Sequence, residues 1–185
     1  MKLLGLIGGT SWPSTVEYYT LINQGINEKL GGLDFSECMI YSFNFADRLQ
    51  KETDLPIIHL ATATAVEIEK QGLKKVALLG TRFTMEFDFF KTKLADHGIE
   101  TLVPNAEDRA YIHASIFDEL AQGIFKTETK AHYLSIIQRL IDGGAEGIIL
   151  GCTEIPLLLK PEDIPVPSFD TVQLHAKAAV DFSLS

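Results

Sequence analysis

The sequence of 185 residues is poor in cysteine and has no long apolar run. Its two cysteines, Cys38 and Cys152, are too few for a disulfide scaffold and are typical of a reducing compartment. The apolar run near the amino terminus covers only residues 3–7 before it meets two glycines, which is too short for the apolar region of a signal peptide. No run approaches the length of a membrane-spanning helix. These absences predict a cytoplasmic protein with no membrane partner.

Basic residues are also scarce, because 16 lysines and arginines stand against 25 acidic residues, for a formal net charge of -9. Binding to nucleic-acid phosphates requires clustered lysines and arginines, so we expect no nucleic-acid partner. An acidic chain can still bind an anionic small molecule, since the backbone N–H groups at a helix start hold a carboxylate locally.

The chain lacks the signatures of common cofactors and metal sites. The glycine-rich turn at residues 8–13 has no third glycine, which excludes the dinucleotide-binding fingerprint, and there is no P-loop pattern. No spacing typical of metal ligands occurs among the five histidines, which are His59, His97, His113, His132 and His175. We therefore expect no cofactor and no bound metal.

What the chain does have is a regular alternation of short apolar runs and amphipathic segments. The apolar runs predict strands at residues 3–7, 39–45, 56–60, 76–79, 101–103 and 147–150, with a further strand ending at 169. Helical periodicity predicts helices from 14 to the glycines at 31 and 32, and at 64–71, 84–97, 108–122, 129–142 and 172–182. This alternation predicts an α/β fold, with mainly parallel sheets flanked by helices.

Two pairs of segments resemble each other. Residues 5–10, Gly-Leu-Ile-Gly-Gly-Thr, resemble residues 77–81, Ala-Leu-Leu-Gly-Thr, and residues 56–62 resemble residues 167–171. Each member of both pairs is interpreted as a strand, a turn and the start of a helix. The repeat predicts two pseudo-symmetric lobes.

We expect the first lobe to comprise residues 1–74 with 167–185, and the second to comprise residues 75–166. The two lobes are unequal, because the first has no counterpart of the strand that leads to Cys152. A strand with its flanking helices, roughly forty residues in a crossover unit of ordinary size, is therefore expected to be missing from the first lobe.

Residues 147–154, Gly-Ile-Ile-Leu-Gly-Cys-Thr-Glu, carry the clearest functional signal. A buried parallel strand delivers the residues after it to the carboxyl edge of the sheet, where open α/β folds bind ligands. An unpaired cysteine is most often a small buried apolar residue. Here Thr153 and Glu154 after Cys152 favour a catalytic thiol, and a helix starting at this point would lower the thiol pKa. Cys38 begins a strand, at the opposite end from ligand sites, and is expected to be structural.

Other residues after predicted strands are suited to binding a carboxylate. Gly9, Thr10 and Ser11 follow the first strand, and Thr81 follows the strand at 76–79, so each turn offers N–H and hydroxyl donors. Tight turns between a strand and a helix also use glycine for steric reasons alone. Arg48 follows the carboxyl end of a strand, where it either clamps a carboxylate or is a solvated surface residue.

Three motifs stand out together. They are Leu-Gly-Leu-Ile-Gly-Gly-Thr-Ser-Trp at 4–12 with Tyr18-Tyr19, Ala-Leu-Leu-Gly-Thr-Arg-Phe-Thr-Met-Glu at 77–86, and Gly-Ala-Glu-Gly-Ile-Ile-Leu-Gly-Cys-Thr-Glu at 144–154. A fourth motif, Phe169-Asp170-Thr171 with His175-Ala176, is weaker. Together they resemble the cofactor-independent aspartate/glutamate racemase family over nearly the whole chain. The resemblance implies two α/β lobes with the substrate between them, no cofactor, and a homodimer.

The resemblance also implies an activity, the racemisation of aspartate, glutamate or a related small amino acid. Members of the family use two cysteines, one from each lobe, as acid and base on opposite faces of the α-carbon. Cys152 corresponds to the thiol of the second lobe, with Thr153 and Glu154 supporting it. The substrate-binding residues that the resemblance implies are Gly9, Thr10, Ser11, Arg48, Thr81, Thr84, Thr153 and Glu154.

The chain departs from the family in its first lobe. Members carry a Cys-Asn-Thr motif there, which has no counterpart between Arg48 and Pro56 in this chain. Without that thiol, racemisation is expected to be feeble. Two alternatives follow: a single-cysteine decarboxylase or isomerase of a small dicarboxylate, and a non-catalytic amino-acid-binding protein.

Overall fold

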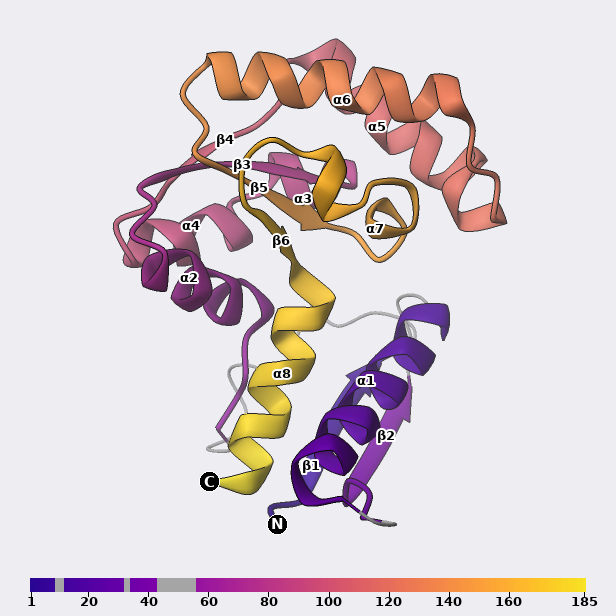
Figure 1. Cartoon of the computed structure of the whole chain (residues 1–185), viewed down its shortest axis with the longest axis vertical. Helices are drawn as coiled ribbons and strands as arrows, with labels where there is room; N and C mark the ends of the chain where they lie inside the picture. Colours follow the sequence, from indigo (N-terminus) through magenta and orange to yellow (C-terminus); the bar gives the residue numbers. More distant parts are fainter. Residues whose placement is uncertain (9–11, 32–33, 43–55) are drawn as a thin grey trace. The chain divides into compact units, whose positions relative to one another are not determined.

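The computed structural model describes residues 1–8, 12–31, 34–42 and 56–185 (Figure 1). The backbone separates into two compact units, the first comprising Met1–His59 with Gln173–Ser185 and the second comprising Leu60–Val172. Both units contain parallel strands accompanied by helices, which confirms the predicted α/β class.

The first unit is built on two parallel strands, β1 (Leu4–Gly8) and β2 (Cys38–Ser42), with α1 (Trp12–Leu30) between them in the chain. The part of α8 (Thr171–Leu184) from Gln173 onward completes the unit. The apolar core joins both helices to β1 and consists of Leu4, Ile22, Ile26, Ala176, Ala179 and Val180. Residues 43–45, the end of the strand expected at 39–45, lie outside the described residues.

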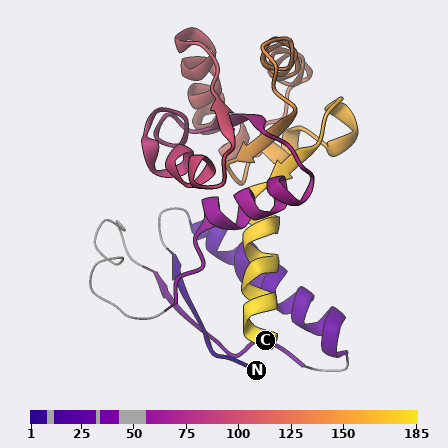
Figure 2. The ribbon, with the colours of Figure 1, turned by 90° about the vertical axis from the view of Figure 1, so that its left-hand side faces the viewer.

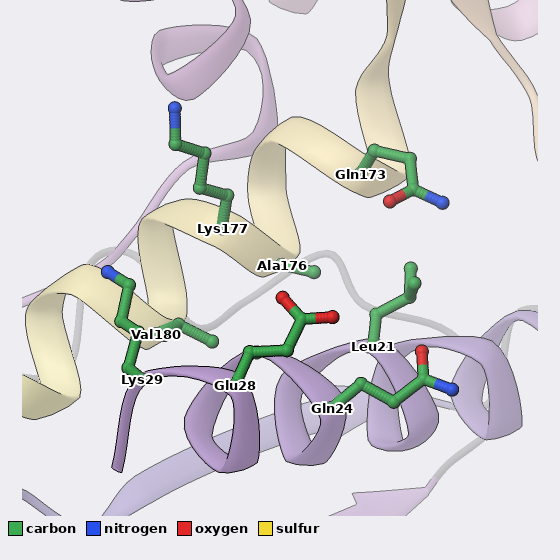
Figure 3. A pocket seen from close by; sticks show the side chains of 9 residues that line it. Leu21, Gln24, Glu28, Lys29, Gln173, Ala176, Lys177 and Val180 are labelled. Carbon is green, nitrogen blue, oxygen red and sulfur yellow. The ribbon is translucent and has the colours of Figure 1, made fainter. Parts of the chain in front are cut away.

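Helices α1 and α8 approach closely because α1 has a glycine at their contact. A Cβ atom on Gly25 would lie 3.0 Å from Cγ2 of Val180, so a side chain there would push the helices apart. Beside this contact the helices leave a pocket of about 350 Å³, lined by side chains of both (Figure 3). Lys29 in its lining forms an ion pair with Asp181. Among the described residues that line the pocket, none has a thiol, imidazole or hydroxyl group.

The strand expected at residues 56–60 is wrong. Residues 56–59 have no regular secondary structure, and α2 (Leu60–Lys70) begins where the strand was expected to end. The buried side chains of α2 recur at helical spacing, at Ala61, Thr64, Ala65 and Ile68. The apolar run before α2 is too short to be distinguished from a loop, whereas the helical spacing of the residues that follow it extends over the whole of α2.

The second unit contains a four-stranded parallel sheet. Its strands lie in the order β4 (Glu100–Leu102), β3 (Lys75–Gly80), β5 (Gly147–Gly151) and β6 (Ser168–Asp170). Besides α2, its helices are α3 (Arg82–Glu86), α4 (Asp88–Asp96), α5 (Ala106–Asp118), η2 (Leu120–Gln122), α6 (Thr127–Asp142), α7 (Ile155–Leu158) and η3 (Pro161–Asp163).

Both faces of this sheet are covered, which explains the continuous apolar runs of its central strands. On one face α5 and α6 pack in a single core cluster with the strand residues Ala77, Leu79, Ile148 and Leu150. The alternate residues point to the opposite face, where Figures 1 and 2 show α2 and α4, and these residues are the fully buried Val76, Leu78 and Ile149.

The helix expected at residues 84–97 is divided at Phe87, which has extended backbone angles of φ -80° and ψ 156°. The N–H of Phe87 donates to the carbonyl of Phe83 and closes α3, after which α4 begins. The division lets the chain change sides, since α3 packs against α5 and α4 packs against α2.

In the first unit, His175 connects three segments of the chain. Its Nε2 lies 2.7 Å from the carbonyl oxygen of Ile58, which can only accept a hydrogen bond, so Nε2 carries the proton. Its Nδ1 lies 3.0 Å from the hydroxyl of Tyr18 in α1 and accepts from it in the neutral ring. Burial lowers the pKa of His175, and the bond to Ile58 opposes that shift in part. The fold therefore favours the neutral imidazole.

Acidification should destabilise the protein through His175. Because its folded-state pKa is lowered from 6.5, the unfolded chain takes up a proton first as the pH falls. The His175 contribution is complete above the unfolded pKa and is lost as the pH falls through the folded pKa, with a slope of at most about 1.4 kcal/mol per pH unit. Urea unfolding between about pH 8 and pH 5 should show this slope in the wild type and a smaller one in His175→Gln.

The matched control is Tyr18→Phe, which removes the hydroxyl facing Nδ1 and keeps the ring. It should lower the unfolding midpoint at every pH and retain the pH slope. Equal slopes in the wild type and His175→Gln would contradict the assignment.

Candidate active site

The candidate site begins where two neighbouring parallel strands of the second unit end. Strands β3 and β5 are paired so that Gly80 lies opposite Gly151. Thr81 follows the first glycine and Cys152 follows the second, so the sheet register sets both residues at the same carboxyl edge. This is the edge at which parallel α/β sheets bind ligands.

Both strand ends require glycine because a third side chain lies over them. A Cβ atom on Gly80 would lie 3.0 Å from Cβ and Cγ2 of Thr84. A Cβ atom on Gly151 would lie 3.1 Å from Cγ2 of Thr84 and 2.8 Å from the carbonyl oxygen of Leu79. The glycines therefore allow Thr84 to pack directly on the paired strand ends.

Thr81 and Thr84 are held together by α3. Thr81 is the N-cap residue of this helix, and its Oγ1 accepts a hydrogen bond from the N–H of Thr84 at 3.5 Å. The two hydroxyl oxygens lie 3.2 Å apart, close enough for a hydrogen bond. Both side chains are half-buried, so the two threonines predicted to bind substrate form one partly accessible hydroxyl pair.

The Cys152 thiol is partly buried and donates a hydrogen bond to Oε2 of Glu154 at 2.7 Å. Burial raises the pKa of the thiol, and the hydrogen bond and negative charge of Glu154 raise it further, to about 12. The N–H groups of Glu154 and Thr153 act in the opposite sense but are outweighed. Near neutral pH Cys152 is therefore a thiol and a potential proton donor.

The expectation that a helix start would lower the pKa of Cys152 is wrong. The helix after it, α7, has four residues and begins at Ile155, beyond Glu154. A single turn supplies a weak dipole, and a neighbouring carboxylate stabilises the protonated thiol instead of the thiolate.

Behind Cys152, the core of the second unit contains a polar group that sequence reasoning missed. The Tyr133 ring is fully buried, and its hydroxyl lies 2.9 Å from Oγ of Ser115 and 3.3 Å from the carbonyl oxygen of Ile112. Burial raises the pKa of Tyr133, and the charge of the Cys152 thiolate would raise it further. Tyr133 was detectable as a member of the buried stripe of α6, but no pattern in the sequence indicates that this stripe passes near Cys152.

A second missed residue is His113 of α5. Its Nδ1 accepts a hydrogen bond from the N–H of Arg82 at 3.3 Å, so the ring lies next to the turn that carries Thr81. The carboxyl end of β6 is also polar. The hydroxyl of Thr171, the residue after this strand, donates to the carbonyl oxygen of Leu150 at 3.1 Å and fixes the start of α8 on the sheet.

The predicted first-lobe residues Gly9, Thr10, Ser11 and Arg48 lie outside the described residues. Cys38 is at the first position of β2, opposite Leu4, and packs half-buried against the core of the first unit. It is therefore at the amino end of its strand, as predicted for a structural cysteine.

Within residues 1–8, 12–31, 34–42 and 56–185, no three His, Cys, Asp or Glu side chains are grouped so that they could hold a metal ion. No helix in the same part of the chain is long and apolar enough to cross a membrane.

Comparison with known proteins places this site in a family. The model of the Asp/Glu/Hydantoin racemase family matches residues 38–179. A structure of a putative Asp/Glu racemase from Yersinia pestis is 37% identical, with a TM-score of 0.92 and full coverage of both chains. A structure of an aspartate racemase homologue from Pyrococcus horikoshii is 31% identical, with a TM-score of 0.87 and full coverage of both chains.

A more distant relative is glutamate racemase from Aquifex pyrophilus, which is 28% identical over 131 residues. That match covers 66% of this chain and 46% of the relative. The family model and the two closely similar structures span the strand ends that carry Thr81 and Cys152. The chain therefore belongs to the Asp/Glu/hydantoin racemase family and is an isomerase of the racemase type.

Proposed function

We propose that the protein acts without a cofactor on the α-carbon of aspartate, glutamate or a related small amino acid, with Cys152 transferring the proton on one face. The observation that carries this proposal is the position of the Cys152 thiol at the carboxyl edge of the sheet, next to the hydroxyl pair of Thr81 and Thr84. Membership of the racemase family and the names of the matched relatives support the reaction type.

The protonation of Cys152 suits one half of this reaction. Removing the α-proton of an amino acid creates a carbanion, which needs a proton donor nearby to complete the turnover. A thiol whose pKa burial and Glu154 raise to about 12 is protonated at neutral pH and can donate its proton to this carbanion. Protonation of the carbanion is therefore the half of the reaction for which the resting state of Cys152 is prepared.

Recognition of the substrate carboxylates is assigned to hydroxyl and N–H groups. Thr81, Thr84 and Thr153 supply hydroxyls at the described edge, and each hydrogen bond to a carboxylate would contribute about 1.5–3 kcal/mol. Gly9, Thr10, Ser11 and Arg48 are proposed to supply the remaining contacts. A homodimer, a cytoplasmic location and the two-lobe division at 74/75 and 166/167 stay predictions from the sequence.

The opposite face of the α-carbon has no second thiol in this chain. The sequence has two cysteines, and Cys38 lies at the amino end of β2. A single thiol removes the α-proton, exchanges it with water and returns a proton on the same face, which replaces the α-hydrogen by one from solvent without inverting the centre. We therefore propose that exchange exceeds inversion. The alternatives, a single-cysteine decarboxylase or isomerase of a dicarboxylate and a non-catalytic binder, are not favoured by the family match.

Proton exchange tests this assignment directly. In D₂O, the wild type should incorporate deuterium at the α-carbon of one enantiomer of aspartate or glutamate faster than it forms the other enantiomer. Proton NMR measures the exchange and chiral chromatography the inversion. Cys152→Ser should reduce exchange by about 10²–10⁴-fold, the usual contribution of a positioned acid–base group, whereas Cys38→Ser should leave it unchanged. Exchange that survives Cys152→Ser would contradict the role of this thiol.

The role of Thr84 can be separated from its packing. Thr84→Val keeps a branched side chain over Gly80 and Gly151 and removes the hydroxyl, so the fold should persist while KM rises about tenfold or more for loss of one hydrogen bond to a carboxylate. Steady-state exchange kinetics measure KM and kcat, and thermal unfolding monitors the fold. The control is Thr92→Val on the exposed face of α4, which should change neither. An unchanged KM in Thr84→Val would exclude the hydroxyl from substrate binding.

A further inference from the structure

The Cys152 sulfur is hydrogen-bonded to the carboxylate of Glu154, which lies two positions later in the chain. Glu154 has helical backbone angles of φ -82° and ψ -28° just before α7. This turn after β5 brings its carboxylate back to the thiol, at a distance of 2.7 Å between Sγ and Oε2. Both side chains are half-buried, so the contact is partly shielded from water.

We propose that Glu154 is the proton partner of Cys152: it keeps the sulfur protonated in the resting protein and accepts the thiol proton whenever the sulfur acts as a base. This inference rests on the function proposed above, and it replaces substrate binding as the role expected for Glu154. Glu154 acts through Cys152 and is therefore a positioning residue.

The proton transfers balance with water as the only other reactant. The S–H bond of Cys152 breaks and its proton moves to Oε2 of Glu154, which leaves a thiolate and a carboxylic acid. The thiolate then takes the α-proton, the electron pair of the C–H bond stays on carbon, and a new S–H bond forms. The α-proton now on sulfur exchanges with water through Glu154, and a solvent-derived proton passes from the thiol to the carbanion. Glu154 then gives its proton back to the thiolate, which restores the resting pair and completes an exchange on one face.

The groups around the sulfur leave Glu154 as the acceptor. The charge of a Cys152 thiolate would be felt by Tyr133 of α6, but burial raises the pKa of Tyr133 and its hydroxyl is bonded to Ser115 and Ile112. The N–H groups of Thr153 and Glu154 favour the thiolate but cannot accept a proton. Among the described residues, Glu154 is the carboxylate bonded to the thiol.

Thiol alkylation tests the pair without any substrate. In a Cys38→Ser background only Cys152 can react, so the rate of carbamidomethylation by iodoacetamide at about pH 8 reports its thiolate. Glu154→Gln removes the negative charge and should lower the thiol pKa. Each unit of decrease raises the thiolate fraction about tenfold and lowers its intrinsic nucleophilicity about threefold, so the rate should rise about threefold per unit. The pH profile should shift to lower pH.

Three variants in the same background serve as controls. Glu162→Gln removes an exposed charge from the same unit and should leave the alkylation rate unchanged. Glu154→Asp keeps the charge but shortens the side chain by one carbon, so its rate should lie between those of the parent and Glu154→Gln. Cys152→Ser should give no labelling. Circular dichroism of each variant verifies that the unit is folded. An alkylation rate and pH profile that are the same in Glu154→Gln and the parent would overturn the proposal.

Deuterium exchange at the α-carbon then tests the catalytic part. Glu154→Gln should lower kcat at least about tenfold with little change in KM, whereas loss of a substrate contact would raise KM. An exchange-active wild type whose kcat survives Glu154→Gln would overturn the relay. If the wild type exchanges no α-proton, the proposed function and the relay that rests on it fail together, while the alkylation rates still decide whether Glu154 controls the protonation of Cys152.

Discussion

The close pairing of β3 with β5 at Gly80 and Gly151 is the constraint on which the candidate site depends. Two strand ends without side chains let Thr84 lie across both, and this contact holds α3 against the sheet. The register then fixes Thr81 and Cys152 as the next residues along the two chains. The absence of side chains at these two strand ends, and not a hydrogen bond between functional groups, therefore positions the reactive edge of the second unit.

The parts of this arrangement that are local in sequence could be predicted. Apolar runs that end in glycine identified β3 and β5, and the polar residues after them identified Thr81 and Cys152. The protonation of the thiol could not be predicted, because it depends on burial against the core of the second unit and on the backward turn of Glu154. The spacing of residues in the sequence indicates neither this burial nor this turn. The roles of Tyr133 and His113 were missed for the same reason, since they come from helices distant in the chain.

In the first unit, a strand that the sequence pattern predicts before Leu60 does not form. A short apolar run preceding Leu60 resembles the strand that ends at Phe169, yet it forms no strand. Its Ile58 carbonyl is satisfied by the His175 ring instead of a neighbouring strand. A strand needs a neighbouring strand to pair with, and an apolar run of only a few residues cannot reveal whether such a neighbour is available. By contrast, the buried stripe of α2 is specified by its own side chains, so its helix persists.

The burial of Cys152 and its hydrogen bond to Glu154 also have a consequence for the chemical durability of the protein. Oxidants attack the thiolate and not the thiol, and burial together with Glu154 raises the thiol pKa to about 12, so that very little thiolate is present at pH 7. The sulfur is therefore poorly reactive towards peroxides and disulfides in the resting protein. A single-thiol site needs this protection, because oxidation to a sulfenic or sulfinic acid would remove the group on which its chemistry depends.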